Sequence, residues 1–126
     1  MLVVDASVVV TFLLHPDEVV NRLRAGGALH APAHLDVEVA SEIRRTDLSG
    51  RLSAGRGTAA IADLQAIPVR RWPIAPLLGR AWELRANVSS YDAVYVALAE
   101  GLDCPLLTRD ARLAGAPGLR TRIEVV

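Results

Sequence analysis

Four acidic residues stand where a carboxylate could take part in chemistry, namely Asp5, Glu38, Asp92 and Asp110. Asp5 directly follows the apolar run 2–4, and Asp110 follows the strand-like run 105–108 by two residues. In an open parallel sheet, ligands bind at the carboxyl ends of the strands. If both runs are neighbouring strands, we expect the carboxylates of Asp5 and Asp110 to emerge at one edge of the sheet.

The helix that carries Asp92 is predicted to begin at Ser89 or Ser90, because serine is a preferred N-cap residue. Asp92 then lies in the first turn, where the helix dipole favours a negative charge. Taken alone, this position suits an ordinary structural acid. The combination of Asp92 with Asp5 and Asp110 favours a functional role instead.

Two glutamates, Glu38 and Glu42, lie four residues apart on a helix predicted over 35–45. Both flank the apolar stripe of that helix, so either could reach the same edge of the sheet. Periodicity alone leaves the choice open. An ordinary surface ion pair with Arg44 or Arg45 suits Glu42 better than Glu38.

Several carboxylates that converge on one edge repel each other, which raises their pKa values or destabilises the fold unless a cation joins them. Hard oxygen ligands select Mg²⁺ or Mn²⁺. Because Mg²⁺ is usually held by one or two carboxylates together with water and substrate phosphate oxygens, a phosphodiester substrate is the natural inference.

Other chemistries lack the residues that they need. All fourteen basic residues are arginine, which disfavours the phosphate-accepting aspartate domains and other mechanisms that normally use a lysine amine. The glycine-rich segment 50–58 resembles a phosphate-binding loop, but Arg56 stands at its lysine position and no strand precedes it. His15, His30 and His34 lack metal-binding spacing and are better interpreted as surface or core histidines.

Short strands alternate with helices along the whole chain. We predict strands over 2–4, 28–31, 67–69, 105–108 and 122–126. We predict helices over 8–14, 17–25, 35–45, 53 or 58 to 65, 76–86 and 91–100. Ser7 is the expected cap of the first helix, and Leu78, Ala81 and Trp82 the expected buried side of the helix over 76–86. This alternation indicates an α/β fold in which right-handed crossovers place helices on both faces of a parallel sheet.

The composition fits a single domain over 1–126 with one core, because 52% of the residues are hydrophobic and 22% are charged. Fourteen acids balance fourteen bases, so any binding of nucleic acid must come from local patches. The lone Cys104 and the absence of a basic leader favour the cytoplasm. The longest apolar run, 8–14, is too short to cross a membrane.

Segments 4–7, 32–38, 91–93 and 107–110 are similar to the motifs of PIN-domain nucleases, and the VapC toxins of bacterial toxin–antitoxin pairs are the nearest group. The resemblance covers the whole chain in order and spacing. It implies a three-layer α/β/α sandwich with a five-stranded parallel sheet. It also implies endonucleolytic cleavage of RNA that depends on Mg²⁺ or Mn²⁺.

The resemblance assigns roles to the four acids. Asp5 and Asp92 correspond to the principal metal ligands, and Glu38 and Asp110 complete the acidic site partly through water. Thr108 matches a hydroxyl residue that could orient a carboxylate or a water molecule. The family also suggests a homodimer and a small antitoxin whose tail blocks the site.

Six arginines are candidates for holding RNA phosphates: Arg44, Arg45, Arg70, Arg71, Arg109 and Arg112. The segments 8–14 and 19–23 carry more aliphatic surface than one sheet face needs, which favours an apolar groove for the antitoxin. Two alternatives share the fold. One is a PIN-like nuclease of RNA processing that has no antitoxin, and the other is a catalytically idle domain that only binds a partner.

Overall fold

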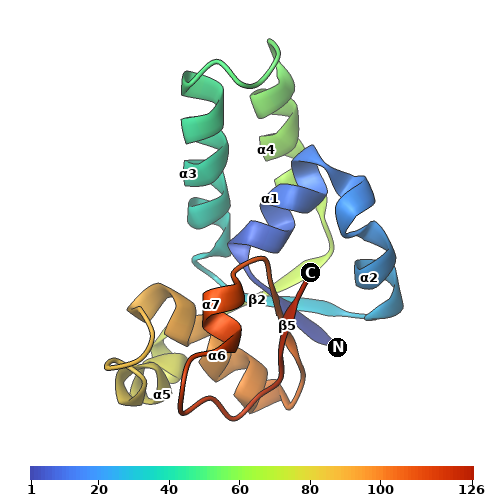
Figure 1. Cartoon of the computed structure of the whole chain (residues 1–126). Coiled ribbons are helices and arrows are strands. Elements are labelled where there is room, and N and C mark those ends of the chain that lie inside the picture. The colour runs from blue at the N-terminus through green and yellow to red at the C-terminus, as the bar shows by residue number, and fades with distance from the viewer.

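The computed structural model describes residues 1–126 and shows a five-stranded sheet between two layers of helices (Figure 1). The strands are β1 (Leu2–Val4), β2 (Leu29–Pro32), β3 (Val69–Trp72), β4 (Leu106–Thr108) and β5 (Ile123–Val125). Their order is β3-β2-β1-β4-β5, and all neighbouring strands are parallel. The predicted three-layer α/β/α fold is confirmed. The strand order reverses between β1 and β4, which is where open parallel sheets bind their ligands.

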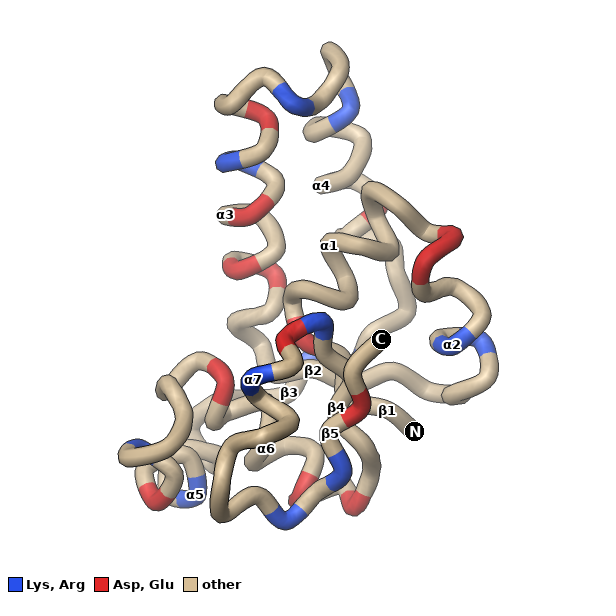
Figure 2. Tube along the Cα trace, in the orientation of Figure 1, with Lys and Arg blue, Asp and Glu red and all other residues tan.

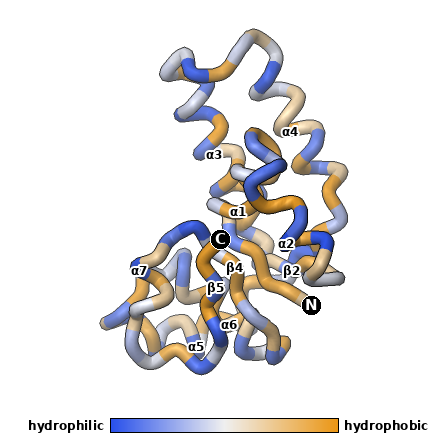
Figure 3. The backbone as a smooth tube through the Cα atoms, turned by 45° about the vertical axis from the view of Figure 1, so that its right-hand side comes forward, coloured by the Kyte–Doolittle hydropathy of each residue, from blue (hydrophilic) through white to orange (hydrophobic).

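The central strands are apolar because helices cover both of their faces. All residues of β1 and β4 are buried, and Figure 3 shows these strands as mainly hydrophobic. The third strand begins two residues later than the sequence predicts. Ile67 ends the preceding helix α4 (Arg56–Ala66) by donating its N–H to the Asp63 carbonyl, and Pro68 has no N–H for a strand ladder.

One face of the sheet is covered by α6 (Ser90–Leu102), which contacts β1, β2 and β4 and carries α5 (Leu78–Glu83) on its outer side (Figure 1). Seven consecutive residues of α6 are buried, and three of them are alanines that allow this close approach. The prediction for 76–86 was wrong in part. A 3-10 turn, η2 (Ala75–Leu77), precedes a shorter helix, and Leu78 and Trp82 are exposed while Ala81 alone is buried.

The opposite face is covered by α1 (Ala6–Leu14), which packs against β4, α3 (Leu35–Leu48) and α4. Asp5, and not Ser7 as predicted, is the N-cap of α1, because its Oδ1 accepts the N–H of Val8 at 3.1 Å. The residues after His15 form a 3-10 turn, η1 (Pro16–Glu18), before the short helix α2 (Val20–Ala25). Gly26 then passes so close to Leu2 that a Cβ atom would collide with that side chain.

The helices α3 and α4 form an arm that extends beyond the sheet (Figure 1). Leu35, Val39 and Ile43 form the predicted buried stripe of α3. The two helices are joined by a turn in which Gly50 and Gly55 have positive φ, a conformation that costs glycine little. The sequence did not predict the short helix α7 (Ala111–Ala114), which follows β4. No helix of the chain has both the length and the apolar character that a membrane span requires.

Candidate active site

Asp5 lies at the carboxyl end of β1 and is almost completely buried. Its Oδ1 accepts hydrogen bonds from the Ser7 hydroxyl at 2.5 Å and from the Val8 N–H at 3.1 Å. Burial raises the pKa of Asp5, and the negative charge of Asp92 raises it further, although the Ser7 and Thr108 hydroxyls and the Val8 N–H lower it. Both the Ser7 and the Val8 hydrogen bonds use Oδ1, so neither of them occupies the second oxygen, Oδ2.

Glu38 lies in the first turn of α3, and its carboxylate is fixed by two neutral or weakly basic donors. Its Oε1 accepts the Tyr95 hydroxyl at 2.8 Å and lies 3.0 Å from His34 Nε2. His34 Nε2 also lies 3.2 Å from the Tyr91 carbonyl, so this nitrogen must carry a proton. Burial lowers the pKa of His34, but the hydrogen bond and the charge of Glu38 raise it to a net value above normal.

The structure distinguishes Glu38 from Glu42, the two glutamates between which helical periodicity could not choose. Glu42 is exposed, and its Oε2 lies 3.3 Å from Arg45 Nη2 in a surface ion pair. Glu38 instead faces Tyr95 of α6, and its charge raises the pKa of Asp92. Glu38 is therefore the glutamate that α3 presents to the other acids.

Asp92 lies in the first turn of α6, where its N–H donates to the capping Ser89 hydroxyl at 3.2 Å. Burial raises the pKa of Asp92, and the charges of Glu38 and Asp110 raise it further. No arginine or histidine forms an ion pair with Asp92 or with Asp5. These two acids thus have no ion-pair partner in the chain, although the charge of the more distant Arg112 lowers the pKa of Asp92.

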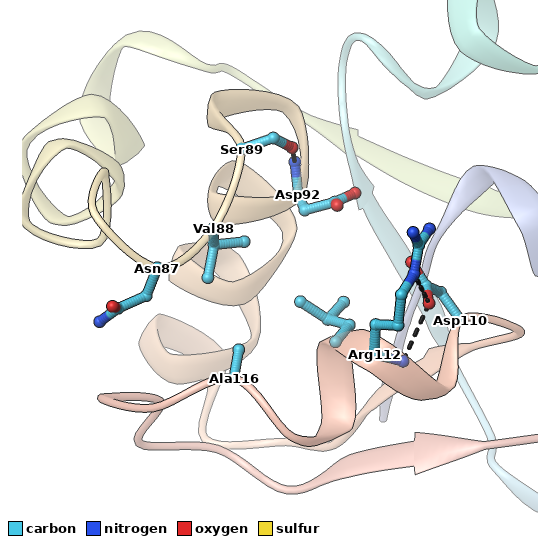
Figure 4. A pocket seen from close by; sticks show the side chains of 8 residues that line it. Asn87, Val88, Ser89, Asp92, Asp110, Arg112 and Ala116 are labelled. Carbon is cyan, nitrogen blue, oxygen red and sulfur yellow. Dashed lines mark hydrogen bonds and ion pairs between the residues drawn. The ribbon is translucent and has the colours of Figure 1, made fainter.

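Asp110 caps α7 and faces Asp92 across a shallow pocket of about 330 Å³ (Figure 4). Its Oδ1 accepts the Arg112 N–H at 2.9 Å, and both carboxylate oxygens pair with the Arg112 guanidinium. These hydrogen bonds lower the pKa of Asp110. The Asp110 N–H donates to the Thr108 hydroxyl at 3.0 Å, so Thr108 contacts one site acid and lowers the pKa of another, Asp5.

The four acids that the sequence singles out therefore come from β1, α3, α6 and α7 to one edge of the sheet, and their charges influence one another. No three acidic, histidine or cysteine side chains converge closely enough to enclose a cation as they stand. The donor chemistry still fits Mg²⁺, because this ion commonly takes one or two carboxylates and fills its other positions with water and phosphate oxygens. Asp5 and Asp92 are the two of these four acids that form no ion pair.

The candidate RNA-binding arginines differ in how the fold uses them. Arg71 is committed to structure, since it pairs with Asp36 at 2.9 Å and also donates to the backbone carbonyls of Leu64, Ile67 and Val69. Arg109 lies beside the site, where its N–H donates to the Ser7 hydroxyl, but its guanidinium pairs with Glu18 at 2.8 Å. Basic and acidic positions are otherwise intermixed along the trace (Figure 2).

The sequence did not single out Ser7, His34 or Tyr95 as parts of the site. For two of these residues, the spacing from a site acid in the sequence could have indicated a role in the site. Tyr95 lies three residues after Asp92 and His34 lies four residues before Glu38, so each shares a helix face with a site acid. Ser7 was expected to cap a helix, and its hydroxyl instead donates to the residue that does so.

We compared the sequence with models of known protein families to identify the class of protein that has this fold and acidic edge. The model of the PIN domain matches residues 2–119. Since this match spans most of the chain, the chain belongs to the PIN-domain family.

Individual proteins of similar sequence or structure indicate the group within this family to which the chain is most similar. Ribonuclease VapC12 of Mycobacterium tuberculosis is 43% identical over 129 residues, which cover 100% of this chain and 99% of that protein. The structure of VapC20 of Mycobacterium tuberculosis, a sarcin-ricin loop cleaving toxin, has a TM-score of 0.67 at 21% identity and covers 94% of this chain and 96% of its own. A toxin–antitoxin complex from Klebsiella pneumoniae has a TM-score of 0.66 at 19% identity, with coverages of 96% and 97%. Within the PIN-domain family, the full-length sequence similarity is thus to the VapC ribonucleases.

Proposed function

We propose that this protein is a Mg²⁺- or Mn²⁺-dependent endoribonuclease and the toxin of a toxin–antitoxin pair. The observation that carries the proposal is the pair Asp5 and Asp92. Asp5 is buried and Asp92 is half-buried, both have raised pKa values, and neither forms an ion pair with the chain. Burying carboxylates without an ion-pair partner lowers the stability of the fold, but it creates a site that a divalent cation can occupy, and such a cation can also bind phosphate. The similarity to ribonuclease VapC12 supports RNA as the substrate.

Each acid has a separate task in this proposal. Asp5 offers Oδ2 to the cation because its Oδ1 is held by Ser7 and Val8, and Asp92 offers its carboxylate from the facing helix. When bound, the cation supplies Lewis acidity and offsets the charge that develops on the phosphoryl oxygens. Glu38 has Oε2 available to orient a water molecule for attack on phosphorus, since Oε1 is held by Tyr95 and His34.

Substitutions at the two ends of α6 provide a test. Asp92→Asn removes a ligand charge and almost no volume, so we expect metal-dependent RNA cleavage to fall on the order of 10³-fold while the fold persists. Asp103→Asn is the matched control. It makes the same chemical change roughly 16 Å away along the helix, at a C-cap with φ of 50° that asparagine adopts readily. Equal cleavage by the two variants would contradict the proposal.

A second surface, formed partly by α1 and α2, is suited to binding an antitoxin. A groove of about 730 Å³ runs between α1, α2 and the segment before β3, and most of its lining is apolar. Its lining residues include Val9, Phe12, Val20, Leu23 and Ile67. We propose that an amphipathic segment of a small antitoxin binds there and that an arginine of its tail pairs with the site acids. The similarity to a toxin–antitoxin complex supports this partner.

The antitoxin proposal is tested by adding the protein encoded next to this gene to the cleavage assay. We expect it to inhibit cleavage by the unaltered chain and by Leu48→Asp, an exposed position outside the groove. Val20→Asp should cleave RNA but escape inhibition. Cleavage that no neighbouring protein inhibits would instead favour an RNA-processing nuclease, and a folded chain that binds but never cleaves RNA would favour an idle PIN domain. The homodimer remains a prediction, which light scattering of the isolated chain can check.

A further inference from the structure

Arg112 is the arginine that forms an ion pair with an acid of the site. Arg112 lines the same pocket as Asp92 and Asp110, and Figure 4 shows its guanidinium beside the carboxylate of Asp110. Its Nε lies 3.2 Å from Asp110 Oδ1 and its Nη2 lies 3.3 Å from Oδ2. The side chain is 92% exposed, so Asp110 alone holds it in place.

This ion pair is easy to break. Exposed pairs contribute little to stability, because water screens the charges and two flexible side chains must be fixed. The cap of α7 does not depend on the guanidinium either, since the Arg112 backbone N–H makes its own hydrogen bond to Asp110 at 2.9 Å. Arg112 can therefore leave Asp110 while α7 keeps its first turn.

A guanidinium and a divalent cation compete for the same carboxylate. When Arg112 pairs with Asp110, one of the four site acids is already neutralised, and the charge available to a cation is smaller. When a cation gathers the acids, the guanidinium loses part of its attraction to Asp110. The two-nitrogen geometry that binds both carboxylate oxygens also fits two oxygens of a phosphate.

We propose that Arg112 exchanges partners, pairing with Asp110 in the metal-free chain and with a phosphate of the RNA when a cation occupies the site. The inference rests on the proposed function and adds a substrate-binding residue to it. Arg109 is less suited to this exchange, because its guanidinium is paired with Glu18 of η1, outside the acidic site. Arg71 is fixed by Asp36 and three carbonyl groups.

Arg122 supplies a matched control. Like Arg112, it is an exposed arginine paired with an acid two residues away, since its Nη2 lies 3.8 Å from Glu124 Oε1. It precedes β5, so it lies at the amino end of a parallel strand, whereas the site lies at the carboxyl ends. Arg112→Ala and Arg122→Ala therefore remove the same group from the two opposite edges of the sheet.

Two binding measurements, neither of which requires cleavage, test the exchange. Mn²⁺ binding by titration calorimetry should become about two- to fivefold tighter in Arg112→Ala, because a weak competitor is lost. Fluorescence anisotropy with a labelled mixed-sequence RNA of 30 nucleotides, in Ca²⁺, should show about fivefold weaker binding and a salt slope smaller by about 0.7. Arg112→Lys keeps the charge, so it should keep the slope and lose only part of the affinity.

The outcomes separate this inference from the proposed function. Arg112→Ala that equals Arg122→Ala in both measurements overturns the inference and leaves the nuclease standing. A changed salt slope with unchanged Mn²⁺ affinity overturns the exchange as well, because it shows a phosphate contact without competition. An unaltered chain that binds no Mn²⁺ overturns the proposed function, and the inference falls with it.

Discussion

The two halves of the acidic site are built differently. Asp5, which is almost completely buried, and Glu38, whose side chain is 27% exposed, form what we call the deep half, because each is held through one oxygen by hydroxyl, amide or imidazole donors from the chain. Asp92 and Asp110 line an open pocket and form the rim half, where the only nearby arginine that lines the pocket is the exposed Arg112. Hydrogen bonds thus preorganise the deep half, whereas the exposed ion pair of the rim half can rearrange when a ligand binds.

The difference follows from the elements that carry each half. Asp5 directly follows a central strand, and Glu38 lies in the first turn of α3, where it accepts a hydrogen bond from the buried Tyr95, so both side chains are fixed by their neighbours. Asp110 instead caps a helix of four residues near the end of the chain. A preorganised carboxylate costs no reorganisation when a cation binds, so the deep half should matter more for the rate.

The largest expected effect is a contrast between Asp5→Asn and Asp110→Asn. Asp5→Asn should lower kcat/KM on the order of 10³-fold, because a ligand charge with no internal partner is lost. Asp110→Asn should lower it only about tenfold, since Arg112 already offsets that charge. Steady-state cleavage of RNA in Mg²⁺ measures both.

Asparagine remains a good N-cap at either position, so circular dichroism should show both variants folded. If Asp110→Asn is damaged as severely as Asp5→Asn, the rim is as important as the deep half, and the comparison breaks down.

A smaller contrast is expected between Glu38→Gln and Glu42→Gln, which make the same change one helical turn apart. Glu38→Gln should lower kcat about 100-fold, because the carboxylate that faces Asp92 loses its charge. Glu42→Gln should stay within about twofold of the unaltered chain, because only an exposed ion pair with Arg45 is lost. Greater damage in Glu42→Gln would mean that α3 presents its other face to the substrate.

Tyr95→Phe tests how the deep half is held in place. The hydroxyl of Tyr95 is buried and donates to Glu38 at 2.8 Å, so its removal should lower kcat about tenfold and the free energy of unfolding by about 1 kcal/mol. The KM for RNA should stay unchanged, because Tyr95 contacts no substrate. Tyr91→Phe is the matched control, since this tyrosine of the same helix is exposed and donates no hydrogen bond. A kcat effect of equal size in both variants would argue against a positioning role.

Much of the fold could be predicted because hydrophobic pattern alone decides it. The buried run of β1 and the stripe of α3 follow directly from residue type and spacing. The errors came where tertiary contacts overrule the pattern. Trp82 was assigned to the core from its helical spacing, yet it is 65% exposed, with Arg85 placed over its ring at 4.8 Å. The start of β3 depended on where α4 ends, and the local signal for a later start was Pro68, which cannot donate to a strand ladder.

The site could be predicted in part for a related reason. Asp5 and Asp110 follow strands, and neighbouring parallel strands bring such residues together by topology. The ambiguity between Glu38 and Glu42 needed the structure, because both flank the same stripe and only the position of α6 distinguishes them. The partners Tyr95 and His34 also depend on how α3 and α6 meet, a contact between segments 57 residues apart.

The smallest expected effect concerns the stability of the chain in a metal chelator as a function of pH. The pKa values of Asp5 and Asp92 are raised in the folded chain, mainly by burial. Above the ordinary carboxyl pKa of 3.8, the folded chain therefore holds more protons than the unfolded chain until both groups have ionised. The free energy of unfolding should fall as pH rises through that window. The lowered pKa of Asp110 has the opposite sign, but it acts as pH falls below the window.

Urea unfolding of the unaltered chain and of Asp5→Asn, at several pH values from about 4 to 7.5, isolates the contribution of the deep half. The difference in stability between the two chains should be smallest at the acidic end, where Asp5 is least ionised, and Asp5→Asn should become the more stable chain, by about 1 kcal/mol, at neutral pH. Added Mg²⁺ should then stabilise the unaltered chain more than the variant, because the cation replaces the missing positive partner. Parallel pH curves for the two chains would show that burial of Asp5 carries no charge penalty, and the deep half would then need no cation to be stable.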